Sequence, residues 1–172
     1  MEDTFLAMDH GTDHVAHVVE QWRTERPDLD VSPLLVIGRV HRVANALTPE
    51  LVAVYARHGL GEGDFDVLAT LRRQGEPYAL TPGELGERTL VTSGAVSKRL
   101  DRLEVRGLVT RRPSDTDGRS RTVALTAEGR RVIDAAMGDH VANEARLLGA
   151  LDVDERATLG TLLGRLASSL GV

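Results

Sequence analysis

The part of the sequence that most constrains the fold lies near its middle, where two helical patterns are followed by two strand patterns. The stretch TPGELGERTL begins at Thr81 and has Glu84 three residues later, which is typical of a helix start, and the turn LVTSG follows. The next helix is predicted to begin at Thr92 or Ser93 and to end at Gly107. The stretches LVTRRP and SRTVALT are then predicted to be β-strands, separated by the turn-forming residues SDTDGRS. Two helices joined by a short turn and followed by a β-hairpin make up a winged helix-turn-helix.

Helical patterns flank this region on both sides. The first segment ends at Pro27, and the second begins after Ser32 and is expected to kink or restart at Thr48-Pro49. After the hairpin, two further helical segments carry apolar stripes that need a partner, the second of them extending to Leu170. Because the winged helix is complete without these helices, their apolar faces are predicted to pack against a second copy of the chain, the alternative being that they cover a monomer core. The predicted fold is mainly α with a small β-hairpin wing and with N- and C-terminal dimerisation helices, divided into residues 1–60, 61–126 and 127–172.

The charge of the chain is distributed unevenly. The formal net charge is −5, but residues 93–131 contain ten basic and five acidic residues, and so carry +5. A basic island in an acidic molecule is expected where a protein contacts a polyanion, because phosphate binding depends on the local patch. The alternative is a solvated surface rich in arginine.

Several other classes of protein are excluded or disfavoured. The chain has no cysteine, which excludes disulfides, thiolate metal sites and cysteine-based catalysis. No apolar run approaches the roughly 18–20 residues of a membrane span, and the acidic N-terminus is unlike a signal peptide, so a cytoplasmic location is expected. His10, His14 and His17 have helical spacing, but no cysteine accompanies them and we predict no metal. With no Gly-rich phosphate loop and no nucleophile–base pair, neither an enzyme nor a bound cofactor is predicted.

The second helix of the helix-turn-helix has a predicted buried face and a predicted exposed face. At about 100° per residue, the apolar face centres on Val96, Leu100 and Leu103. Lys98 lies roughly opposite Val96, so Lys98 and Arg102 are expected to point outward. The candidates for contacts with DNA bases and phosphates are Ser93, Ser97, Lys98 and Arg102 in this helix, and Arg119 and Arg121 in the hairpin.

The run GAVSKRLDRLEVRGLVTRRPSDTDGRS resembles the winged-helix core of the multiple-antibiotic-resistance-regulator (MarR) family, and the resemblance extends from about residue 12 to 170. It implies a dimeric bacterial transcription regulator, usually a repressor, that binds a pseudopalindromic operator in double-stranded DNA. It also implies release from DNA when a small, often anionic or aromatic, ligand binds. The wing departs from the family pattern, since Gly118 and Arg119-Ser120 stand where a second acidic residue and paired arginines are usual.

A finer resemblance concerns the ligand. The chain resembles the urate-responsive branch of the family, whose ligand-binding set would correspond here to Trp22, Asp66, Arg99 and Arg111. The same set occurs in relatives that respond to trans-aconitate and citrate, and the stretches PYALTP and TLVTSG are at least as similar to those. Urate is therefore the first ligand hypothesis, a tricarboxylate is the second, and a ligand-independent DNA-binding protein is the alternative.

The positions of these residues suggest how a ligand would act. On the helical wheel Arg99 lies only about 60° from Val96, so its half-buried guanidinium is expected to need a carboxylate partner, and Asp66 is the predicted one. An anionic ligand would compete for Arg99 and repel Asp66. It would thereby shift the second helix of the helix-turn-helix, which is the recognition helix. Trp22 would supply an apolar wall of the pocket from the N-terminal helices, and Arg111 a second anion contact. The alternatives are a tryptophan at the dimer interface, a structural ion pair and a solvated Arg111.

Overall fold

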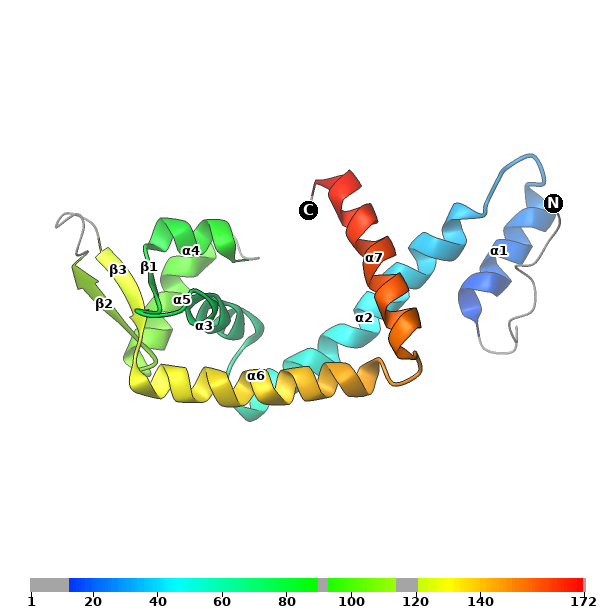
Figure 1. Ribbon diagram of the computed structural model, residues 1–172. Helices are drawn as coiled ribbons and strands as arrows, with labels where there is room; N and C mark the ends of the chain where they lie inside the picture. Colours follow the sequence, from blue (N-terminus) through cyan, green and yellow to red (C-terminus); the bar gives the residue numbers. More distant parts are fainter. Residues whose placement is uncertain (1–12, 90–92, 114–120, 172) are drawn as a thin grey trace. The chain divides into compact units, whose positions relative to one another are not determined.

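The computed structural model describes residues 13–89, 93–113 and 121–171, with the side chains of residues 93–96 left outside the description. The chain divides between Pro49 and Glu50 into two compact units, referred to below as the first and the second unit. None of the described helices is long and apolar enough to cross a membrane. The elements, labelled in Figure 1, are α1 (His14–Glu25), α2 (Pro33–Arg57), α3 (Glu62–Arg73), β1 (Ala79–Leu80), α4 (Pro82–Arg88), α5 (Ser93–Val105), β2 (Val109–Pro113), β3 (Arg121–Leu125), α6 (Ala127–Leu147) and α7 (Val153–Leu170).

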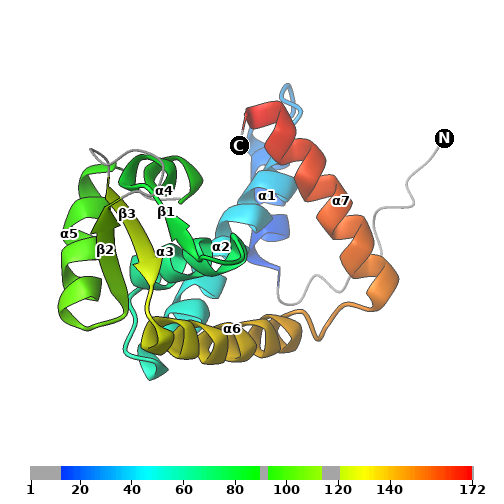
Figure 2. The same ribbon diagram turned by 60° about the vertical axis from the view of Figure 1, so that its left-hand side comes forward.

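The second unit contains the predicted winged helix. Helices α4 and α5 lie beside a small antiparallel sheet (Figure 2), in which the strand order is β1-β3-β2. The predicted strands β2 and β3 pair from Val109 opposite Leu125 to Pro113 opposite Arg121. The third strand, β1, was not predicted, because its two residues are too few to produce an alternating pattern.

The predicted ends of the two central helices are confirmed. The hydroxyl of Thr81 accepts a hydrogen bond from the backbone N–H of Glu84 (3.2 Å), and the Glu84 carboxylate accepts one from the Thr81 N–H (2.8 Å). The second of these hydrogen bonds holds the pKa of Glu84 below its usual value. Helix α5 begins at Ser93, and Gly107, with a φ of +68°, lies in the left-handed conformation that ends the helical segment.

The helix does not restart at Thr48-Pro49, which was one of the two expectations there, because α2 continues from Pro33 to Arg57 with Pro49 inside it. A proline removes one backbone donor from the helix, and the remaining hydrogen bonds evidently suffice to continue it. The Thr48 hydroxyl also donates to the carbonyl of Ala44 (3.0 Å), one turn earlier in the same helix.

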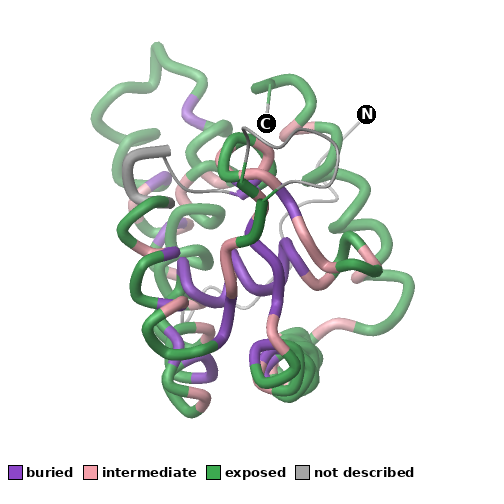
Figure 3. The backbone as a smooth tube through the Cα atoms, turned by 90° about the vertical axis from the view of Figure 1, so that its left-hand side faces the viewer, coloured by how far each residue is buried: buried purple, intermediate pink, exposed green. Residues whose placement is uncertain are grey.

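The main hydrophobic core belongs to the second unit and lies where α3, α5, α6 and the sheet meet. Leu68 and Leu71 of α3 are fully buried, as are Leu103 of α5 and Ile133 of α6, and Leu100 is nearly so. The apolar face predicted for α5 is thus confirmed at its two described leucines, whereas the side chain of Val96 lies outside the description. Buried residues, purple in Figure 3, are outnumbered by exposed ones along much of the chain.

Large apolar side chains remain exposed in both units. In the first unit, Val15, Val19 and Val31 form a small core with Leu35, yet the same helix α2 exposes a row of aliphatic residues. Helix α7 of the second unit has no buried residue. These are the faces predicted to pack against a second copy of the chain: Leu34, Val36, Ile37, Val40 and Val43 in α2, and Leu159, Leu162, Leu163 and Leu170 in α7.

One glycine of α6 is required by a close backbone approach. A Cβ atom at Gly129 would lie 1.9 Å from the carbonyl oxygen of Leu108, so we expect Gly129→Ala to lower the free energy of unfolding by about 2–3 kcal/mol. The control is Gly138→Ala in the same helix, where no atom lies within 4 Å and alanine should stabilise by about 0.5–1 kcal/mol. Urea denaturation of both variants checks this, and equal effects at the two positions would contradict the described contact.

Candidate functional site

The exposed face of α5 carries the side chains that its sequence pattern predicts. Ser97 and Lys98 are exposed, and the side chain of Arg102 is 63% exposed although one of its nitrogens contacts a carboxylate. Leu100 and Leu103 on the opposite face are anchored in the core. The helix therefore presents polar and cationic groups to the solvent from a fixed position.

The remaining predicted DNA contacts lie at the start of α5 and in the hairpin. Arg121 is exposed at the first position of β3, and Arg112 on the neighbouring strand β2 is also exposed. Arg119, together with the altered wing motif, lies outside the described residues, and so does the side chain of Ser93. The described part of the hairpin thus adds two exposed cations to those of α5.

The buried carboxylate of Asp64 is the centre of the ionic contacts between α3 and α5. Its side chain is 8% exposed and lies beside three arginines of α5 and the turn after it. The distances are 3.8 Å to Arg99 Nε, 2.9 Å to Arg102 Nη2 and 3.7 Å to Arg106 Nη1. Since residues three and seven positions apart share one face of a helix, a single carboxylate on α3 can reach all three.

The described contacts place Asp64 beside Arg99, whereas the sequence analysis named Asp66 as its partner. Residues two apart on a helix differ by about 200° in direction, so Asp64 and Asp66 leave α3 on different sides. Asp66 is half-buried and Asp64 is buried. The sequence does contain a signal for the right partner, because the i, i+3, i+7 spacing of the three arginines marks a face that needs a buried acid.

The guanidinium of Arg99 is packed against the backbone of α3. A Cβ atom at Gly63 would lie 2.0 Å from Arg99 Cζ, so only glycine permits this approach. The Arg99 side chain is 18% exposed, and its Nε and Nη1 atoms are buried and have no hydrogen-bond acceptor among the described residues. Buried donors are normally satisfied, so these two mark a place where an acceptor from outside the chain would be stabilised.

Arg111 connects the wing to the recognition helix. From β2 it donates to Asp101 (2.6 Å) and Glu104 (2.8 Å) of α5, and its backbone N–H also donates to Glu104 (3.0 Å). The hydrogen bond to Asp101 raises the pKa of Arg111 above its usual value. A ligand anion at Arg111 would have to compete with two carboxylates, neither of which was singled out from the sequence.

Trp22 lies in α1, in the first unit, whereas Asp66, Arg99 and Arg111 lie in the second. Its side chain is 46% exposed, so it is not a core residue of the described chain. A half-exposed indole presents a flat apolar surface that a ligand or a second copy of the chain could cover.

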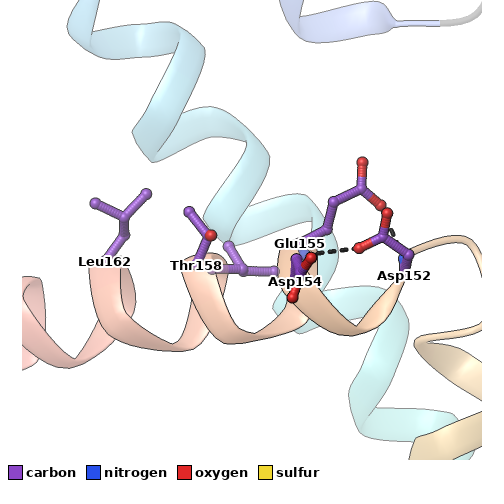
Figure 4. Close-up of a pocket in the computed structure, with 6 residues that line it drawn as sticks. Asp152, Asp154, Glu155, Thr158 and Leu162 are labelled. Atoms are coloured by element: carbon purple, nitrogen blue, oxygen red, sulfur yellow. Dashed lines mark hydrogen bonds between the residues drawn. The ribbon is translucent and has the colours of Figure 1, made fainter.

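A separate pocket of about 360 Å³ lies along the first turns of α7 (Figure 4). Asp152, Asp154 and Glu155 line it together with Thr158, Leu159 and Leu162. Asp152 and Glu155 cap the helix start through hydrogen bonds of 2.8 and 2.9 Å between side chains and backbone N–H groups. Three carboxylates repel an anion, so this pocket does not suit the predicted ligand class.

The comparisons with known proteins agree with the geometry. A model of the MarR family matches residues 58–120. The HTH-type transcriptional regulator PecS of Dickeya dadantii is 41% identical over 156 residues, which are 91% of this chain and 94% of that protein. The HTH-type transcriptional repressor YetL of Bacillus subtilis is 26% identical and covers 91% of this chain and 92% of its own length.

Two solved structures share the fold at similar levels of identity. The MarR family transcriptional regulator Sco5413 from Streptomyces coelicolor superimposes with a TM-score of 0.69 at 29% identity, over 83% of this chain and 97% of its own. A mutant MarR from E. coli, complexed with operator DNA, gives a TM-score of 0.67 at 28% identity, over 80% of this chain and 99% of its own.

A helix-turn-helix with a wing and an exposed basic recognition face defines a winged-helix DNA-binding protein. The chain belongs to the MarR family of transcriptional regulators. Members of this family bind operator DNA and form dimers, and they are not enzymes.

The contacts of Asp64 predict which aspartate stabilises the second unit. We expect Asp64→Asn to lower the free energy of unfolding by about 1–3 kcal/mol, because a neutral amide leaves the half-buried Arg99 without its counter-charge. This range allows for solvent screening at the exposed Arg102.

The matched control is Asp66→Asn in the same helix, which should cost less because Asp66 is less buried. Chemical denaturation measures the free energy of unfolding of both variants. If Asp66→Asn were the more damaging change, the assignment of Asp64 as the central carboxylate would be wrong.

Proposed function

We propose that this MarR-family regulator is a homodimeric repressor that leaves its operator when a small anionic ligand binds at Arg99. The observation that carries the proposal is the pair of buried donors on Arg99, Nε and Nη1, which have no acceptor in the described chain. An anion supplies the acceptor atoms that these two donors lack, beside a guanidinium whose contact with the Asp64 carboxylate is 3.8 Å long. The same arginine belongs to the DNA-binding helix, so the ligand would act directly on the element that contacts DNA.

The ligand set that the resemblance implies is Trp22, Asp66, Arg99 and Arg111. Urate, a planar anion, matches an indole wall and guanidinium donors, and trans-aconitate or citrate is the alternative. Asp64 joins this set in our proposal because it shares Arg99 and would be repelled by an incoming anion.

The contacts of Asp64 support a route from ligand to DNA. An anion at Arg99 takes over part of the positive charge that stabilises the buried Asp64, so the carboxylate must rely more on Arg102 and Arg106. A change in how the three arginines contact Asp64 would move α5, which carries them, relative to α3, which carries Asp64. A recognition helix displaced in this way binds its operator less tightly.

We propose that residues 61–126 bind DNA and that residues 1–60 and 127–172 dimerise, with the first of these segments also forming a wall of the ligand pocket. The protein would act in the cytoplasm on a pseudopalindromic operator. Its proposed DNA contacts are Ser93, Ser97, Lys98, Arg102, Arg119 and Arg121.

A mobility-shift titration tests this function. The protein is titrated against the DNA upstream of its own gene, alone and with urate, trans-aconitate or citrate. Specific binding that one of these anions abolishes supports the proposal and selects the ligand. Specific binding that ignores all three supports a ligand-independent repressor, and failure to bind any operator selected from random DNA contradicts the proposal.

For the DNA contacts, we expect Lys98→Ala to weaken binding to specific and random DNA alike and to lower the slope of log affinity against log salt by about one, the effect of one lost phosphate contact. Arg165→Ala, which removes one exposed charge from α7, is the control and should leave the slope unchanged. Binding curves at several salt concentrations decide the matter. An unaltered slope for Lys98→Ala would remove this residue from the interface.

For the ligand site, we expect Arg99→Ala to raise the ligand concentration needed for half-release about tenfold or more, since a charged hydrogen bond contributes about 1.5–3 kcal/mol. Trp22→Phe should give a smaller shift in the same direction. Arg23→Ala, next to Trp22 in α1, serves as the control. A wild-type ligand response in both site variants would show that the ligand binds elsewhere.

A further inference from the structure

Tyr78 has an unusual backbone conformation in the loop that leads from α3 into β1. Its φ is +56°, a region that residues with a side chain rarely adopt. Hydrogen bonds fix it on both sides, since its N–H donates to the carbonyl of Gly75 (2.7 Å) and its carbonyl accepts from the N–H of Leu125 (3.1 Å). The fold therefore holds a tyrosine at a position where glycine would be less strained, which calls for a role of its side chain.

The ring of Tyr78 is contacted by two arginines. The guanidinium carbons of Arg72 and Arg130 lie 5.0 and 4.9 Å from the ring centroid, a distance at which cation–π attraction operates. Both arginines are joined to one carboxylate, because Asp134 lies 2.6 Å from Arg72 Nε and 3.8 Å from Arg130 Nε. We call these four residues the Tyr78 cluster.

The Tyr78 cluster connects three elements of the second unit. Arg72 is near the end of α3, Tyr78 directly precedes β1, and Arg130 and Asp134 lie in the first turns of α6. Helix α6 runs past α3 and away from the sheet (Figure 1), and it leads to α7, which exposes its apolar residues. The cluster thus lies where the winged helix joins the segment proposed to dimerise.

Burial alone does not account for the Tyr78 cluster. The side chains of Arg130 and Asp134 are 45% and 46% exposed, and that of Arg72 is 35% exposed. Partly exposed ionic contacts add little to overall stability, but they are directional and fix the relative orientation of the elements that carry them.

We propose that Tyr78 is a positioning residue that sets the orientation of the winged helix on α6, and thereby the spacing of the two recognition helices along the operator. The inference rests on the proposed function, that is, on a dimer that binds two half-sites through α5. Half-sites must match the separation of the recognition helices, so an orientation that is held firmly gives a sharp preference for one spacing.

The test compares operators that differ only in half-site spacing. The operator is first recovered from random DNA with the wild-type protein, and one or two base pairs are then inserted between its halves. Tyr78→Gly removes the ring while tolerating the positive φ, and Tyr78→Phe keeps the ring as the matched control. The preference is the ratio of affinities for the natural and the altered spacings.

We expect wild type and Tyr78→Phe to have the same ratio of affinities for the natural and the altered spacings. We expect this ratio to be at least threefold lower for Tyr78→Gly, with an unchanged affinity for an isolated half-site. Tyr78→Gly with the full wild-type preference would overturn this inference and leave the proposed function intact. A wild-type protein that binds all spacings equally would overturn both.

A second pair of variants tests the same contact without changing Tyr78, in case Tyr78→Gly fails to fold. Arg130→Ala removes one guanidinium from the ring and should reduce the spacing preference in the same way. Arg131→Ala, whose exposed partner is Glu128, is the control and should not. Equal preferences for Arg130→Ala and Arg131→Ala would overturn the assignment.

Discussion

The position of the recognition helix depends on a buried charge. The side chain of Asp64 is 8% exposed, and a carboxylate at such a site is costly unless cations satisfy it. The cations that the described residues place beside it are Arg99, Arg102 and Arg106, which come from α5 or the turn after it. Together with Leu100 and Leu103, which anchor the other face, this fixes α5 on α3 and turns its exposed residues outward.

In the proposed function, the same arrangement would make the helix sensitive to a small anion. Moving a two-state equilibrium from about 1:99 to 99:1 requires about 5.5 kcal/mol of differential affinity, whereas one charged hydrogen bond contributes about 1.5–3 kcal/mol. One charged hydrogen bond is therefore insufficient, but an anion that accepts from both buried Arg99 donors would contribute about 3–6 kcal/mol, and a dimer would have two such sites. This energy requirement gives a physical reason why the proposed ligand site would lie directly on the DNA-binding helix of a dimer.

The sequence predicted the winged helix from strong local signals: the capping pair Thr81 and Glu84, the apolar spacing of Leu100 and Leu103, and the hairpin strands. It also predicted a half-buried Arg99 with a carboxylate partner. The described contacts place Asp64 beside Arg99, a partner that the sequence analysis did not single out, because packing decides which side of α3 faces α5. The Tyr78 cluster joins residues far apart in the chain, so no local pattern could reveal it. The contacts of Arg111 with Asp101 and Glu104 are close in sequence but cross from a strand to a helix, where no single periodicity applies.

The most direct test of the central claim is the reciprocity of ligand and operator binding. Calorimetric titration of the effector anion into the free protein and into the protein–operator complex gives two affinities. If the anion and DNA act on the same helix, the affinity for the anion must fall in the complex by the factor by which the anion lowers the affinity for DNA, and Arg99→Ala must abolish that difference. An anion that binds equally well with and without operator would contradict the account.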